Sequence, residues 1–173
     1  PPRSTLFPIT TLFRSRDIIN GNGHTISGNK SNRVFSVDSY ENSLTINNIT
    51  FIDGNHDEGG ILYAYTGNMI INDCKFENNT VDLNSAAINF NGTSLLVNNS
   101  EFKSNKAEEF AGAIGVDEAN DVKIINTNFY NNTAKNYAVL GIYDGNVSIV
   151  NCTFENNHAD EEVGVAYLNC ENA

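Results

Sequence analysis

The stretch LTINNITFIDGN, residues 44–55, recurs four more times along the chain without a gap in the alignment. Each copy carries a phenylalanine, and successive phenylalanines are 25, 26, 27 and 25 residues apart. A repeat of this length predicts a solenoid, in which each repeat forms one coil that stacks on the next. The later copies are MIINDCKFENNT (69–80), LLVNNSEFKSNK (95–106), VKIINTNFYNNT (122–133) and VSIVNCTFENNH (147–158).

Within each copy, apolar side chains alternate with polar ones, which is the period of a β-strand with one buried face. In the first copy, Leu44 and Ile46 precede Phe51 by seven and five residues. Asn48 and Gly54 lie three residues before and after Phe51, and both residue types favour turns. Another apolar run begins ten residues after each phenylalanine. Each repeat is therefore predicted to contain a first strand, a short strand that carries Phe, a loop and a third strand.

This pattern predicts an all-β fold: a right-handed, single-stranded parallel β-helix over residues 17–173. It comprises about six coils of roughly 25 residues, with three short strands per coil. An earlier coil fits the same frame, with Ile19, Ile26 and residues 34–37 at the first-strand, Phe and third-strand positions. Stacking like on like predicts a column of phenylalanine rings inside and ladders of asparagine at the corners.

The cysteines are predicted to be free thiols. Cys74 and Cys152 share one repeat position but lie three coils apart, which is about 14 Å at the spacing of paired strands. A disulfide needs Cα atoms within about 7 Å. We therefore expect these two side chains to act as small packing residues, and the third cysteine, Cys170, leaves the count odd.

Residues 1–16 match nothing downstream. The stretch TLFPITTLFRS (5–15) resembles the conceptual translation of a common DNA-sequencing adapter and differs from it only at Ile9. We therefore interpret residues 1–16 as an artefactual or disordered leader, with a genuine capping strand as the alternative. Residues 17–173 are expected to be a β-helical fragment of a longer chain.

Charge and hydropathy exclude two classes of partner. The formal net charge is −11, whereas binding of a phosphate backbone requires clustered Lys and Arg, so no nucleic-acid partner is expected. No run of eighteen apolar residues occurs, so no membrane span is expected in this segment.

The pattern F-x-x-N, followed by strands such as GGIL (59–62) and AGAI (111–114), resembles the repeats of chlamydial polymorphic membrane proteins. It resembles still more closely the adhesin-like surface proteins of methanogenic archaea. The stretch IINGNGHTISG (18–28) looks like the early coil of pectin lyase-like β-helices. The resemblance implies a secreted, non-enzymatic protein at the cell surface. Such a protein acts as a structural stalk or as a surface that binds glycans or proteins.

The alternative function is that of a partial or degenerate carbohydrate-active β-helix, of the pectate lyase or polysaccharide hydrolase type. The chain contains no Asp-Asp pair, and Gly23-His24 is followed by Thr25, so the motifs of a β-helical hydrolase are missing. We therefore expect no catalytic residue and no cofactor. The bases after Arg33 are Lys75, Lys103, Lys106, Lys123 and Lys135.

Two surface patterns are candidates for binding. Acidic residues recur in the loop after each phenylalanine, and stacking would align them as a stripe that Lys135 interrupts. Such a stripe predicts either a solvated edge that deters association or a weak calcium site, which His56 could extend for a transition metal. Its members are Asp57, Glu58, Asp82, Glu108 and Glu109, followed by Asp160, Glu161 and Glu162. Tyrosines of the third strands, if exposed, would stack on a sugar; they are Tyr63, Tyr65, Tyr143 and Tyr167.

Overall fold

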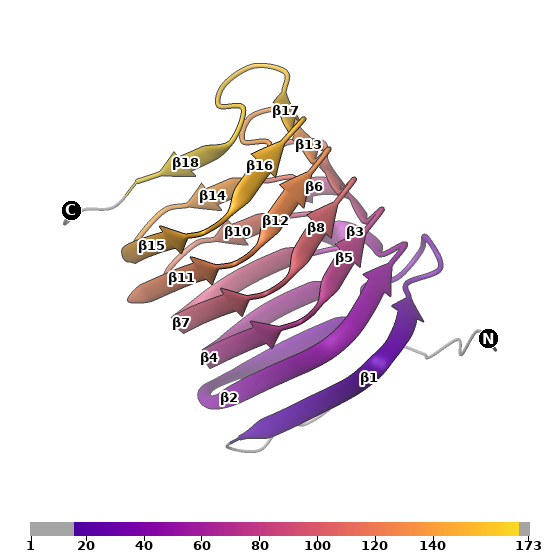
Figure 1. Cartoon of the computed structure of the whole chain (residues 1–173), viewed down its shortest axis with the longest axis vertical. Helices are drawn as coiled ribbons and strands as arrows, with labels where there is room; N and C mark the ends of the chain where they lie inside the picture. The colour runs from indigo at the N-terminus through magenta and orange to yellow at the C-terminus, as the bar shows by residue number, and fades with distance from the viewer. Residues whose placement is uncertain (1–15, 170–173) are drawn as a thin grey trace.

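Strand pairing follows the sequence repeat in the computed structural model, which describes residues 16–169. Leu44 pairs with Met69, Met69 with Leu95, Leu95 with Val122, and Val122 with Val147, always in parallel. The result is a parallel β-solenoid of about six turns, consistent with right-handed coiling, as predicted. Figure 1 shows the turns stacked from β1 at the indigo end to β18 at the yellow end.

The strands form two sheets, one of thirteen strands and one of five. The larger sheet holds β1 (Asp17–Ser27), β2 (Phe35–Ile52), β4 (Leu62–Asn72), β5 (Lys75–Glu77), β7 (Ile88–Asn98), β8 (Glu101–Lys103), β10 (Ile114–Val116), β11 (Asp121–Ile125), β12 (Asn128–Tyr130), β14 (Leu140–Ile142), β15 (Asn146–Val150), β16 (Thr153–Glu155) and β18 (Ala166–Leu168). The smaller sheet holds β3 (Asn55–Glu58), β6 (Thr80–Asn84), β9 (Lys106–Ala107), β13 (Thr133–Ala134) and β17 (His158–Ala159).

The larger sheet contains the first, Phe-bearing and third strands that the repeat predicts. The early coil is confirmed too, because Ile19 pairs with Ile46 and Ile26 with Phe51. The smaller sheet is an addition: part of the expected loop after each phenylalanine is itself a short strand. In β4 and β7 the third strand also continues without a break into the next first strand. The expected leader, apart from Arg16, lies outside the described residues.

A column of phenylalanine rings fills the centre. From Phe51 to Phe154, through Phe76, Phe102 and Phe129, successive ring centroids lie 5.1, 4.7, 5.0 and 4.9 Å apart. These separations match the roughly 4.7–4.9 Å between paired strands, so the backbone sets the stacking distance. The apolar residues seven and five positions before each phenylalanine are buried as predicted. In the four turns from Phe51 to Phe129 they are at most 1% exposed; they are Leu44, Ile46, Met69, Ile71, Leu95, Val97, Val122 and Ile124.

A buried ladder of asparagines runs beside the rings. Asn105 accepts hydrogen bonds at Oδ1 from the backbone N–H and the Nδ2 of Asn79, at 3.2 and 2.8 Å. Its own Nδ2 donates to Asn132 Oδ1 and to the carbonyl oxygen of Phe76, at 2.9 and 3.0 Å. Asn132 repeats this pattern with Asn157 and Phe102. Of the predicted corner ladders, this one is internal and satisfies both side-chain and backbone groups. The other, three residues before each phenylalanine, is exposed, and there Asn151 donates to Asn126 Oδ1 at 2.7 Å.

The corners also need residues that tolerate a left-handed backbone. One such residue lies three positions before each phenylalanine, with φ between 49° and 54°: Asn48, Asp73, Asn99, Asn126 and Asn151. A second lies two positions after it, with φ between 52° and 56°: Asp53, Asn78, Ser104, Asn131 and Asn156. The residue three positions after the phenylalanine therefore forms the buried ladder, while its predecessor makes the turn.

Cys74 and Cys152 are free thiols, as predicted, and occupy the inward position two residues before the phenylalanine. Cys74 Sγ donates to the carbonyl oxygen of Asn72 at 3.1 Å. The equivalent hydroxyl of Ser100 donates to Asn98 O at 2.9 Å. In four turns this position thus holds a small side chain that returns a hydrogen bond to its own strand, whereas Ile49 fills it two residues before Phe51. Cys170 lies outside the described residues.

We expect Asn105→Ala to destabilise the solenoid strongly, because it leaves two donors of Asn79 without their acceptor in the core. The expected loss in the free energy of unfolding is roughly 2–6 kcal/mol, at about 1–3 kcal/mol for each unsatisfied group. Denaturant unfolding measures it, and replacement of the exposed Asn120 by Ala is the control. Equal losses in the two variants would contradict a stabilising ladder.

A second prediction concerns alkaline pH. Burial raises the pKa of Cys74 from its ordinary 9.0 to about 11. Between these values the unfolded thiol ionises while the folded one stays protonated, so the free energy of unfolding falls as pH rises from about 9 to about 11. The expected fall is about 2 kcal/mol. Comparison with Cys74→Ser isolates this effect from other titrating groups, and parallel stability curves for the two proteins would refute it.

Candidate functional site

The outer face of the third strands departs from the repeat. Strand alternation points Leu62 and Ala64 inward, so Tyr63 and Tyr65 face outward, and Tyr65 is 39% exposed. One outward column contains residues that pair across successive strands but do not repeat a single residue type; it runs Ser36, Tyr63, Asn89, Gly115, Gly141 and Tyr167. Inside the solenoid like lies on like, whereas in this column only Gly115 and Gly141 are neighbours of the same type.

The two adjacent glycines of this column open a hollow of about 280 Å³ over β7, β10 and β14, which we call the glycine hollow. A Cβ atom at Gly115 would lie 1.9 Å from Ser85 Oγ, so glycine is required for the close approach of that hydroxyl. A Cβ atom at Gly141 would lie 3.2 Å from the ring of Tyr137. The remaining lining residues are Asn84, Asn89, Phe110, Ala111, Asp117 and Tyr143.

Aromatic rings gather along one side of the glycine hollow. Tyr137 stacks on Tyr167 with ring centroids 4.5 Å apart, and Phe110 lies 5.4 Å from Tyr137. Tyr143 lies 5.6 Å from Tyr167 and remains 37% exposed. Burial, together with a hydrogen bond to Tyr143, raises the pKa of Tyr137 above its ordinary range. The structure thus brings the predicted Tyr143 and Tyr167 together with two rings that sequence reasoning missed.

Acceptor groups gather on the other side of the glycine hollow. Partial burial raises the pKa of Asp117, and the charges of Glu58 and Glu118 raise it further. Asn84 donates from Nδ2 to Glu58 Oε1 at 3.2 Å. Its Oδ1 is buried and has no hydrogen-bond partner within the part of the chain that the structure describes. The hollow therefore combines an aromatic side with a side rich in carboxylate and amide oxygens.

The other predicted tyrosines of this face are engaged elsewhere. Arg33 lies over the ring of Tyr63, 4.6 Å from its centroid, and donates to the carbonyl oxygen of Glu58 at 2.6 Å. The same guanidinium lies 3.0 Å from Nδ1 of His56. Tyr65 packs against Tyr40 with centroids 4.4 Å apart. Arg33 thus fixes the loop beside Tyr63, and His56 contacts this arginine.

The acidic stripe divides into two columns. One column faces solvent and consists of Asp57, Asp82 and Glu108. Each of them comes directly after a residue that pairs with its counterpart in the neighbouring turn, in β3, β6 and β9. Glu58 instead pairs with Asn84 in the column that borders the glycine hollow. Lys135 interrupts the stripe as expected, with Nζ 3.9 Å from Glu109 and 3.7 Å from Glu161. Calcium binding by the stripe stays a prediction.

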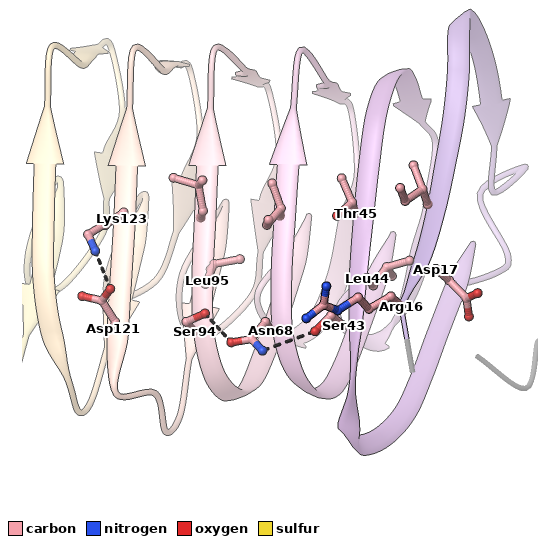
Figure 2. Close-up of a pocket in the computed structure, with 13 residues that line it drawn as sticks. Arg16, Asp17, Ser43, Leu44, Thr45, Asn68, Ser94, Leu95, Asp121 and Lys123 are labelled. Carbon is pink, nitrogen blue, oxygen red and sulfur yellow. Dashed lines mark hydrogen bonds and ion pairs between the residues drawn. The ribbon is translucent and has the colours of Figure 1, made fainter. Parts of the chain in front are cut away.

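A larger hollow of about 500 Å³ lies on the outer face of the first strands (Figure 2). Ser94 donates to Asn68 at 2.7 Å, Asn68 donates to Ser43 at 3.3 Å, and Lys123 pairs with Asp121 at 2.5 Å. Figure 2 shows Ser43, Asn68 and Ser94 joined in a row across successive turns, and the Lys123–Asp121 pair within a single strand. The polar groups of this surface therefore largely bind one another, which makes it a weaker candidate than the glycine hollow.

Comparisons with protein-family models, curated proteins and solved structures gave no significant match. Among residues 16–169, no group of three or more His, Cys, Asp or Glu side chains is placed to hold a metal ion. No helix long and apolar enough to cross a membrane occurs in this range.

The floor of the glycine hollow can be tested by substitution. Gly115→Ala should lower the free energy of unfolding by about 1–3 kcal/mol, because its Cβ would collide with Ser85 Oγ. Adding Ser85→Gly to the same chain should restore most of that loss, and should stabilise it more than Ser85→Gly stabilises the parent chain, where glycine only relieves the φ of 63° at residue 85. Urea unfolding of both variants provides the measurement, and Gly141→Ala, whose Cβ has more room, is the matched control. A loss that Ser85→Gly fails to relieve would argue against this contact.

Proposed function

We propose that this chain belongs to a non-enzymatic, adhesin-like protein of the cell surface, in which the solenoid is a stalk that binds glycans along its third-strand face. The glycine hollow carries the proposal. Sugar-binding sites join aromatic rings, which cover the apolar face of a pyranose, to side chains that hydrogen-bond its hydroxyl groups. In the glycine hollow, Tyr143 and Phe110 provide the aromatic rings, and Asp117 and Asn89 provide the hydrogen-bonding groups.

The proposal also rests on how the scaffold supports the hollow. Phe90, Val116 and Ile142 are buried directly beneath the outward residues of β7, β10 and β14. Rigid support reduces the ordering that a ligand must impose on the protein. The proposed partners are glycans, or the glycan chains of proteins, on another cell, and the proposed location is extracellular.

A glycan array tests this function. We expect the chain to bind one class of oligosaccharide, and Tyr143→Ala to weaken that binding about fivefold, because ring stacking contributes about 1 kcal/mol. Tyr130→Ala is the matched control, since this half-buried tyrosine lies on β12, away from the hollow. An array without any bound glycan, or equal weakening by both substitutions, would contradict the proposal.

One observation favours a carbohydrate-active enzyme as the second candidate. Asp117 has a raised pKa beside the charges of Glu58 and Glu118, and unequal carboxyl groups of this kind perform acid and base roles in glycosidases. Incubation with polysaccharides, followed by assays for new reducing ends and, with calcium present, for unsaturated uronate products, tests this activity. Products that form in the parent chain but not in Asp117→Asn would replace the adhesin proposal with the enzymatic one.

A further inference from the structure

We infer that the glycine hollow binds a sugar unit with a free amino group, whose ring packs against Phe110 and Tyr143 while its ammonium group faces Asp117 and Asn84. This inference rests on the proposed function and specifies its ligand. It follows from the charge of the hollow, from an unpaired acceptor, and from the size of the cavity.

Charge excludes acidic sugars. Asp117 lines the hollow, Glu118 follows it in the chain, and Glu58 binds the amide of Asn84 at the border. The cation in contact with this segment is Arg33, which already binds the carbonyl oxygens of Glu58 and Gly59. A uronate would bring another negative charge beside these carboxylates, whereas an ammonium group would gain charge-assisted hydrogen bonds.

Hydrogen-bonding capacity separates amino sugars from neutral ones. Asp117 and Glu58, when ionised, can only accept hydrogen bonds, and an ammonium group supplies three donors and no acceptor. Asn84 borders the same space with an Oδ1 atom that has no partner among the described residues. A buried acceptor without a partner is costly, so a small rotation of this amide toward a ligand donor would relieve that cost. An acetylated amine offers a single N–H without charge and matches these groups less well.

The geometry restricts the site to one ring. A cavity of about 280 Å³ lies at the low end of the range for ligand pockets, so it holds one unit of an oligosaccharide. Tyr143 is the more exposed ring and is available to a ligand, whereas Tyr137, at 6% exposure, supports it from behind.

Calorimetric titration at about pH 6, where a sugar amine is protonated, tests the inference. The three probes are oligomers of glucosamine, of N-acetylglucosamine and of galacturonate. We expect glucosamine oligomers to bind at least tenfold more tightly than the acetylated ones, and galacturonate oligomers to bind most weakly. Asp117→Asn should remove most of that tenfold preference. Asp121→Asn is the matched control, because this carboxylate pairs with Lys123 on the first-strand face.

A substitution in the floor of the glycine hollow tests whether the sugar binds there. Gly141→Ala adds one methyl group to the hollow with its nearest neighbour 3.2 Å away, so the fold should tolerate it while all sugar binding weakens several-fold. Equal affinity for the amine and acetyl forms, or an unchanged preference in Asp117→Asn, would overturn the amino-sugar inference and leave the proposed function standing. No binding of any of the three probes, together with a blank glycan array, would overturn both.

Discussion

Each turn of the solenoid exchanges backbone hydrogen bonds with the turns above and below it. Lys106 donates to Asn79 O and Thr133 donates to Asn105 O, at 2.8 and 2.9 Å, and similar bonds recur on every face. This pairing fixes the distance between turns, and every inward side chain must pack against its neighbours at that distance. Phenylalanine rings do so by lying nearly parallel, with centroid separations of 4.7 and 4.9 Å that stacked aromatic pairs favour. Asparagine does so because its amide repeats the hydrogen bonds of the backbone.

The same constraint leaves the outer surface free to vary. A substitution on the outside changes no contact within the column of rings, so unlike residues can occupy equivalent positions there. The outer column of the third strands uses this freedom, with Tyr63, Asn89 and Gly115 in successive turns. Regularity inside and variety outside are therefore compatible. The strict repeat therefore describes the interior and not this face.

The sequence predicted the interior well and the candidate site poorly, for one physical reason. Inward residues repeat, so Phe51 with its partners, and even the weaker Ile19 and Ile26, could be placed by spacing alone. Phe110 and Tyr137 both lie eight residues after a phenylalanine of the repeat, so spacing alone places them at equivalent positions. The other repeats carry Gly59, Asn84 and Glu162 there, so no pattern of residue types marks this position as part of a surface. Glu58 was expected in the acidic stripe, but its strand also carries it beside Asn84. That position follows from register and not from composition.

A sequence signal for the hollow did exist in the repeat lengths, which increase to 26 and 27 residues around it. Val116 and Asp121 pair with Phe90 and Ser94, so residues 117–120 span the corner that residues 91–93 span in the turn below. The longer corner ends β10 early and places Asp117 at the rim of the hollow. An insertion at a corner leaves the ladder of rings intact, because the strands on both sides keep their register. Corner length is thus the means by which a rigid solenoid can acquire or exchange a binding group at little cost to its stability.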